Sequence, residues 1–170
     1  MRTSAVIRTF TGVCVVGAVA AAMTAVASAQ VGGNVNVSAS VSRNCRVTIT
    51  SISFPAYDPV NANATAELSG AGNLNVACTK GVAPEITLSL GSNADSSTRR
   101  MVNGTTEFLT YELYQPDGST VWGAAQTGAF TADPAESRAA RDFQIVGRVP
   151  GGQDAAAGNY ADTVVATVNF

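Results

Sequence analysis

Apolar and polar residues alternate with a period of two along most of this chain, and this pattern constrains its fold more than any other feature. After residue 30 hardly any stretch repeats apolar residues at helical spacing, whereas Leu74, Val76 and Cys78 alternate with polar or small neighbours. Successive side chains of a strand point to opposite faces, so such runs suit sheets that place one face on a core. The chain is therefore predicted to be all-β.

Predicted strands follow one another, separated by turns rich in Gly, Pro and Asn. They cover residues 46–54, 73–79, 85–90, 108–115, 120–123, 142–149 and 159–170. The inward positions of the first strand shift phase near Ser51, which predicts a β-bulge there. Pro116-Asp117-Gly118-Ser119 predicts a hairpin turn, because Asp-Gly tolerates the positive φ angles of tight turns. Several short strands of this kind favour a β-sandwich over an α/β enzyme fold.

The regions between these strands are predicted to be loops. Residues 56–72 and 91–104 have loop composition, and residues 134–141 have room for a turn or two of helix at most. Arg99-Arg100 lies in the second of these loops. We therefore expect it to be a solvated pair of charges and not a binding patch.

Residues 1–29 are predicted to be an export signal. Arg2 and Arg8 give a positive start, residues 12–26 are an apolar run, and Ala27-Ser28-Ala29 fits the small-x-small cleavage rule. Of the 170 residues, 141 would then remain, enough for one domain with a core. We expect an N-terminal strand and linker over residues 30–44 and a domain over residues 45–170.

Composition excludes several classes of function. Without Arg2 and Arg8 the mature chain has 8 basic and 12 acidic residues, a net charge of about −4, which disfavours a nucleic-acid surface. The sequence has no His, so Ser-His-Asp and Cys-His catalysis and most zinc sites are absent. No apolar run after residue 30 approaches the roughly 18 to 20 residues that a membrane span needs. We predict a non-enzymatic protein with no cofactor, no metal and no transmembrane segment in the mature chain.

Two cysteines remain after removal of the leader, which takes Cys14 with it. Cys45 and Cys78 form an even pair in an exported chain, and an oxidising compartment favours their oxidation. One disulfide is the prediction, with two free buried thiols as the alternative.

The segment before Cys45 also has the alternating pattern of a strand, but no hairpin turn signal lies next to it. Val35, Val37, Ala39 and Val41 alternate with Asn and Ser. A strand with one apolar face invites pairing when it is exposed, so it must be buried somewhere. It is either the first strand of its own sandwich or a strand that fills a groove in a neighbouring molecule. The apolar run that ends at Phe170, with no strand after it to complete the sandwich, favours the second interpretation.

Several motifs together resemble one known family. They are Asn44-Cys45, the run LNVAC at 74–78, LTYELY at 109–114, VWG at 121–123 and GNYADTVVATVNF at 158–170, the last being the most specific. Across the mature chain the sequence resembles the spore coat protein U family, which includes pilin subunits of archaic chaperone-usher pili.

The resemblance implies an incomplete immunoglobulin-like Greek-key β-sandwich that is completed by a donated N-terminal strand. It also implies a periplasmic chaperone that first lends a strand, and an outer-membrane usher that exchanges it for the N-terminal strand of the next subunit. By motif position Cys45 and Cys78 match the family's disulfide pair. The donor residues are Val35, Val37, Ala39 and Val41, and the residues that border the acceptor groove and contact the chaperone are Tyr160, Val164, Ala166, Val168 and Phe170.

The predicted function is that of a structural subunit in a head-to-tail homopolymer, exported through the periplasm to a surface fibre for attachment or biofilm. The length argues against a two-domain tip adhesin. A spore or cell coat protein of the same fold is one alternative. A self-contained monomeric carbohydrate-binding sandwich is another, for which Tyr111, Tyr114, Trp122 and Tyr160 are the candidate aromatics, although strand alternation places Tyr111 and Tyr160 in the core.

Overall fold

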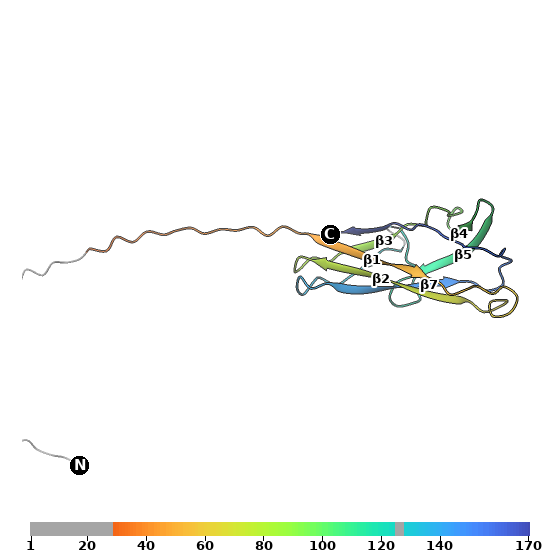
Figure 1. Cartoon of the computed structure of the whole chain (residues 1–170). Helices are drawn as coiled ribbons and strands as arrows, with labels where there is room; N and C mark the ends of the chain where they lie inside the picture. The colour runs from red at the N-terminus through yellow and green to blue at the C-terminus, as the bar shows by residue number, and fades with distance from the viewer. Residues whose placement is uncertain (1–28, 125–127) are drawn as a thin grey trace, which may run out of the picture. The chain divides into compact units, whose positions relative to one another are not determined.

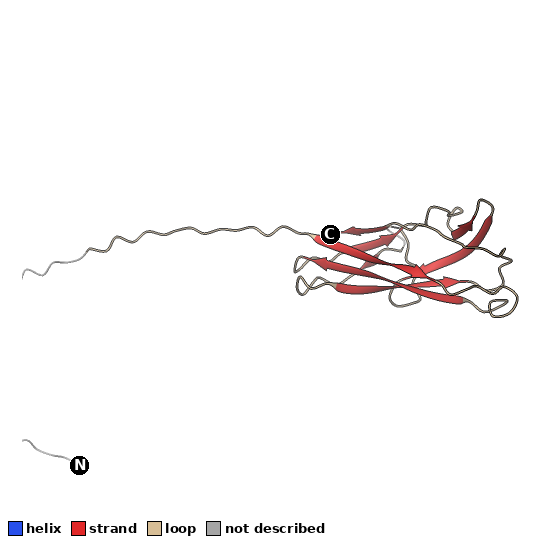
Figure 2. Cartoon of the chain, in the orientation of Figure 1, coloured by secondary structure: helices blue, strands red, loops and turns tan. Residues whose placement is uncertain are grey.

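The alternating runs of the sequence form antiparallel strands that pack as two sheets, as seen in a computed structural model (Figures 1 and 2). The structure describes residues 29–124 and 128–170, so the export signal predicted over residues 1–29 lies, except for its last residue, outside the described residues. Residues 40–170 make up one compact unit, and the residues before them belong to another. In the described part every regular element is a strand, which confirms the all-β prediction.

The larger sheet has five strands in the order β1-β2-β7-β5-β4, all antiparallel to their neighbours. Its strands are β1 (Cys45–Ser53), β2 (Leu68–Cys78), β4 (Arg99–Asn103), β5 (Glu107–Tyr114) and β7 (Arg141–Val149). The strands β2 and β7 are aligned over nine residue pairs, which makes them the longest ladder of the sheet. The two edges of this sheet are therefore β1 and β4.

The smaller sheet has three strands in the order β6-β3-β8. They are β3 (Glu85–Leu88), β6 (Phe130–Thr131) and β8 (Ala166–Asn169). Since β3 lies in the middle, β8 is hydrogen-bonded to a named strand along one side only in the described part of the chain.

The core lies between the two sheets and contains the inward rows that the alternation predicts. Trp122 is fully buried, and its indole N–H donates to the carbonyl oxygen of Ile86 at 2.9 Å. Its ring meets Phe130 edge to face, and Phe130 meets Phe143 in the same way. Burying Trp122 with its only donor satisfied removes it from any sugar-binding surface.

Two local predictions are confirmed. The ladder between β1 and β2 changes register between Thr50 and Ser53, as expected of a bulge near Ser51. In the predicted hairpin turn Gly118 has a φ of 68°, and the Gln115 N–H donates to the carbonyl oxygen of Thr120 at 2.8 Å. Hydrogen bonds to its carboxylate, those of Thr120 foremost, lower the pKa of Asp117 to about 2.

Other boundaries were predicted wrongly. The region 91–104 was expected to be a loop but contains β4, and β2 begins at Leu68 within the other expected loop. The expected strand at 159–170 is regular only over β8, and the strand at 120–123 is a single bridge between Val121 and Tyr114. Residues 29–44 have no strand assignment in this single chain, so the N-terminal strand stays a prediction, and residues 134–141 contain no helix, which is within the predicted limit of a turn or two. Short pairings of this kind depend on partners distant in sequence, which local periodicity does not reveal.

The disulfide joins the first residue of β1 to the last residue of β2. Cys45 and Cys78 are direct cross-strand partners with Cα atoms 4.1 Å apart, so the predicted disulfide is confirmed. The bond closes a segment with a sequence separation of 33 residues. It holds the edge strand β1 onto the sheet at the end where β1 begins.

Replacing both cysteines, as Cys45→Ala with Cys78→Ala, should lower the free energy of unfolding by about 3 to 4 kcal/mol, because the unfolded chain regains the freedom that the cross-link removes. Urea unfolding followed by tryptophan fluorescence measures this difference. The wild-type protein in reductant should lose a similar amount, and the double variant should not respond to reductant. Equal midpoints for oxidised and reduced wild type would contradict the prediction.

Candidate functional site: an open strand edge above an apolar groove

In the segment that leads into β8, alternate residues direct their backbone N–H and C=O groups to opposite sides. Ala161 exchanges two backbone hydrogen bonds with Val102 of β4, at 2.9 and 3.1 Å. Val165 accepts from the Ser89 N–H at 2.9 Å, and β8 continues as the antiparallel partner of β3. Odd-numbered residues therefore direct their N–H and C=O groups toward β4 and β3.

The even-numbered residues of this segment face the other way. In an antiparallel strand, neighbouring residues direct their backbone groups to opposite sides. The side chains of Tyr160, Asp162, Val164, Ala166 and Val168 are half-buried, while those of the odd-numbered residues between them are exposed. We call residues 160–168 the free edge, because its even-numbered residues combine inward side chains with backbone groups that no named strand of the described part pairs.

Within residues 29–124 and 128–170, a second unpaired edge belongs to β1. The carbonyl oxygen of Asn44 accepts from the Thr79 N–H at 2.8 Å, and the register that follows pairs β1 with β2 through Arg46 and Thr48. The backbone groups of Val47 and Ile49 then point away from β2. Ile49 is 52% exposed although its side chain belongs to the inward row.

After its bulge, β1 turns onto the inner face of the larger sheet. A Cβ on Gly70 or Gly147 would lie 2.7 Å from the ring of Phe54, so these glycines make room for that ring on β2 and β7. Phe54 also meets Tyr111 of β5 edge to face, with ring centroids 6.3 Å apart. The residues at the end of β1 thus form one wall of a groove.

The groove lies between this wall and the free edge and has a volume of about 900 Å³. The inner faces of β5 and β7 form its floor. Asp162 is the one carboxylate among its lining residues, which are otherwise apolar or uncharged. Those from the floor and the free edge include Leu109, Tyr111, Leu113, Ile145, Val149, Tyr160, Val164 and Ala166.

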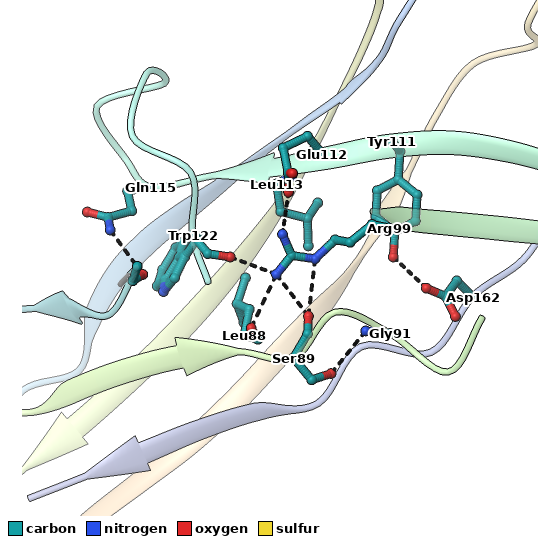
Figure 3. Close-up of polar contacts among 11 residues, drawn as sticks. Leu88, Ser89, Gly91, Arg99, Tyr111, Glu112, Leu113, Gln115, Trp122 and Asp162 are labelled. Atoms are coloured by element: carbon teal, nitrogen blue, oxygen red, sulfur yellow. Dashed lines mark hydrogen bonds and ion pairs between the residues drawn. The ribbon is translucent and has the colours of Figure 1, made fainter. Parts of the chain in front are cut away.

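Asp162 explains why a polar residue interrupts the apolar row of the free edge. Its Oδ2 accepts the hydroxyl proton of Tyr111 at 2.7 Å, and its Oδ1 accepts from the backbone N–H groups of Ser92 and Asn93 at 3.0 and 3.1 Å. The Asn93 side-chain amide donates to the same oxygen at 2.9 Å. Burial, and then the hydrogen bond to Asp162, raise the pKa of Tyr111, so the tyrosine is neutral and donates (Figure 3).

Arg99 is the clearest correction to the sequence analysis, which placed it in a solvated pair. Its side chain is fully buried, and its guanidinium donates to the carbonyl oxygens of Leu88, Ser89 and Trp122. It also forms an ion pair with Glu112 (Figure 3). A charge can be buried only when it is paired and hydrogen-bonded, and here partners on three other segments meet that condition. Arg100, by contrast, remains on the outer face and lies over the ring of Phe108.

The structure brings together part of the predicted acceptor set. Tyr160, Val164 and Ala166 line the groove, and Val168 packs against the core. Phe170 is 48% exposed and is not a lining residue. The analysis of the sequence named Tyr111 only as a candidate sugar-binding aromatic, and it did not include Asp162 or Arg99 among the site residues. The polar interruption of the apolar row at Asp162 was the only signal that could have identified one of them.

The four predicted donor residues are exposed. Val35, Val37 and Val41 are 87%, 91% and 84% exposed, and Ala39 is exposed as well. Their role as donors, like the groove residues' contact with a chaperone, remains a prediction.

No described residues form a cluster of His, Cys, Asp and Glu side chains suited to a metal ion. Within residues 29–124 and 128–170 there is also no helix with the length and hydropathy of a membrane span.

Comparison with known proteins identifies the family. The model of the Spore Coat Protein U domain matches residues 32–167. The chain belongs to this family. Protein U of Myxococcus xanthus is 34% identical over 174 residues, covering 91% of this chain and 96% of that protein. The Spore Coat Protein U domain is a structural domain, and the protein is not an enzyme.

A solved structure shares the fold. One chain of the CsuC-CsuE chaperone-tip adhesion subunit pre-assembly complex, from archaic chaperone-usher Csu pili of Acinetobacter baumannii, superposes with a TM-score of 0.56 at 18% identity. The match covers 76% of this chain and 40% of that chain. It shows that this member of the Spore Coat Protein U domain family has the immunoglobulin-like sandwich fold.

Arg99→Met should lower the free energy of unfolding by about 3 kcal/mol or more, because three carbonyl oxygens and Glu112 lose their shared donor. Chemical denaturation of the purified protein measures this loss. Arg100→Met is the matched control and should cost less than about 1 kcal/mol, since Arg100 forms an ion pair with the exposed Asp95 and ion pairs at the surface contribute little. Equal losses of unfolding free energy for the two substitutions would show that the buried contacts of Arg99 do not stabilise the fold.

Proposed function

We propose that this protein is a structural subunit of an extracellular surface fibre, an archaic chaperone-usher pilus, that polymerises by donor-strand exchange. In this proposal residues 30–41 of one subunit lie in the groove of the next. Val35, Val37, Ala39 and Val41 point inward and cover the floor. The fibre supports attachment or biofilm formation.

The observation that carries the proposal is the free edge above the apolar groove. An unpaired edge attracts another strand, and an extended peptide that adds to it gains main-chain hydrogen bonds along its length. The even-numbered residues of the free edge offer those backbone groups and direct side chains such as Val164 and Ala166 into the same groove. A segment with alternating apolar residues matches both requirements.

The interaction is strong enough to hold a fibre together. Burying four small apolar side chains at roughly 1 to 2 kcal/mol each, with a ladder of hydrogen bonds at about 1 kcal/mol each, contributes on the order of 10 kcal/mol before ordering costs. The donor segment and the free edge are different surfaces of the chain, so the contact is head-to-tail. Contacts of this type that do not close on themselves build filaments.

The same groove needs a temporary occupant before assembly. A periplasmic chaperone that lends a strand would protect the apolar floor, and an outer-membrane usher would exchange it for the donor segment of the next subunit. The solved relative supports this role for a chaperone, because that structure is itself a chaperone-subunit complex of archaic chaperone-usher pili. The proposed route is export through the periplasm to the cell surface.

A polymeric coat is the second candidate. The family description names a spore coat protein, and Protein U of Myxococcus xanthus matches nearly the whole chain. A coat built from the same strand exchange would use the same groove and donor segment. The location of the polymer distinguishes the two: a layer around cells or spores indicates a coat, and extended filaments indicate a pilus.

Val37→Asp in the full-length protein should abolish polymerisation, because a carboxylate would have to enter an apolar groove without a partner. Asn36→Asp is the matched control and should polymerise normally, since residue 36 lies on the polar face of the donor segment. Unheated gel electrophoresis of surface extracts, with electron microscopy of the cells, would show the oligomer ladder and its loss.

Polymers of Val37→Asp as abundant as those of the wild type would refute strand exchange by this segment. A wild-type protein that is monomeric at all concentrations and binds an oligosaccharide would favour the carbohydrate-binding sandwich instead.

A further inference from the structure

Two chains of polar contacts, which we call links, connect the free edge to the larger sheet. Both end at neighbouring residues of β5. One link joins Asp162 to Tyr111, and the other runs from Val165 through Ser89 and Arg99 to Glu112. Figure 3 shows the first link and the part of the second that runs from Ser89 to Glu112. Tyr111 and Glu112 are consecutive, so the larger sheet supports the free edge at two adjacent positions.

The first link encloses the Asp162 carboxylate on several sides. Besides the hydrogen bond from Tyr111, the carboxylate accepts hydrogen bonds from two backbone N–H groups and one side-chain amide of the turn that follows β3. A Cβ on Gly91 would lie 1.9 Å from Oδ2 of Asp162, and Gly91 has a φ of +94°. Glycine at position 91 thus satisfies the backbone conformation and the close approach of the carboxylate together.

The second link uses both the backbone and the side chain of Ser89. Its N–H donates to the carbonyl oxygen of Val165 at 2.9 Å, and its hydroxyl oxygen accepts from the Val165 N–H at 2.9 Å. Its own carbonyl oxygen accepts from Arg99 at 2.8 and 3.1 Å. The buried guanidinium thereby fixes the residue that holds the free edge in place.

These links matter because the strand ladder is incomplete at this end of the free edge. β3 ends at Leu88, and the ladder with β8 stops at Ala166. Between Tyr160 and Val165 the described backbone contacts are the bridge between Ala161 and Val102 and the bonds of Ser92 and Ser89. The position of Val164, which lines the groove, therefore depends on polar contacts on either side of it.

We propose that these two links preform the acceptor edge, which makes Tyr111, Asp162 and Ser89 positioning residues for strand acceptance. The inference rests on the proposed function, because it assumes that a strand of a second copy of this chain occupies the groove. A preformed edge spares the incoming strand the cost of ordering its partner. If a link is removed, only a fraction of the molecules have an edge in the conformation that binds a strand. The apparent dissociation constant is then the intrinsic one divided by that fraction.

The test uses the full mature chain with Val37→Asp, which cannot donate its strand and leaves the groove free. The probe is a fluorescent peptide that spans residues 32–41 of the wild-type sequence, and anisotropy gives its dissociation constant. Adding Tyr111→Phe should weaken binding about tenfold, since a hydrogen bond to a charged group is lost. Asp162→Asn should weaken it in the same direction, because an amide has one acceptor oxygen where the carboxylate has two, so either the tyrosine hydroxyl or the donors of the turn lose their acceptor.

Two controls separate positioning from stability. Tyr114→Phe removes a hydroxyl from the outer face of the same strand and should leave the dissociation constant unchanged. Val76→Ala destabilises the core from a position that does not line the groove, so it should lower the melting temperature without changing the affinity. Amide hydrogen exchange should rise at residues 160–165 in Tyr111→Phe and not in Val76→Ala.

The outcomes distinguish the two proposals. If the peptide binds the Val37→Asp protein with and without Tyr111→Phe equally well, the positioning role is refuted and strand exchange stands. If Val76→Ala weakens binding as much as Tyr111→Phe, the effect is one of stability and the inference is also refuted. If no variant binds the peptide, both the inference and the proposed function are refuted.

Discussion

The backbone groups of the even-numbered residues of the free edge, which no named strand of the described part pairs, are the constraint on which the rest of the structure depends. A strand edge that borders an apolar groove leaves hydrogen-bonding groups and nonpolar side chains without partners, and both are costly to leave unpaired. β1 faces the same groove with a second unpaired edge, and Ile49 is exposed as a result. The sandwich is thus well packed on one side, around Trp122, and open on the other, where the floor formed by β5 and β7 lacks a covering strand.

Between the bridge at Ala161 and the ladder that begins at Ala166, the open edge is held by contacts other than a strand ladder. In this protein buried polar groups supply the support: Arg99 links β4 and β5 to the end of β3, and Asp162 links the free edge to Tyr111. Such groups are expensive to bury, and they are stable because every charged atom named has a close partner. The disulfide has a comparable role for the opposite wall, since it fastens the first residue of β1 to β2. Both walls of the groove are therefore anchored to the larger sheet.

This arrangement connects the fold to assembly. The larger sheet has five strands, with a nine-pair ladder between β2 and β7, whereas the smaller sheet has only short strands. A strand added beside the free edge would extend the smaller layer and cover the floor. The family match and the likeness of one solved chain establish the sandwich fold, and its completion by another chain is the proposal made above. Fibre and coat are both consistent with that geometry, because each needs a head-to-tail contact repeated from copy to copy.

The sequence by itself determined the properties that depend on neighbouring residues. The period-two alternation predicted the strands, its phase shift predicted the bulge near Ser51, Asp117-Gly118 predicted the turn, and the two remaining cysteines predicted the disulfide. Only the tertiary structure decided the features that depend on distant partners. Arg99 is buried because carbonyl oxygens from positions 88, 89 and 122 converge on it. The sequence analysis assigned β4 to a loop because an arginine at an inward position breaks the apolar alternation that is expected of a strand. Likewise, no neighbouring residue in the sequence explains why Asp162 interrupts an apolar row. The tertiary structure explains it, because folding places the Tyr111 hydroxyl within hydrogen-bond distance of the carboxylate.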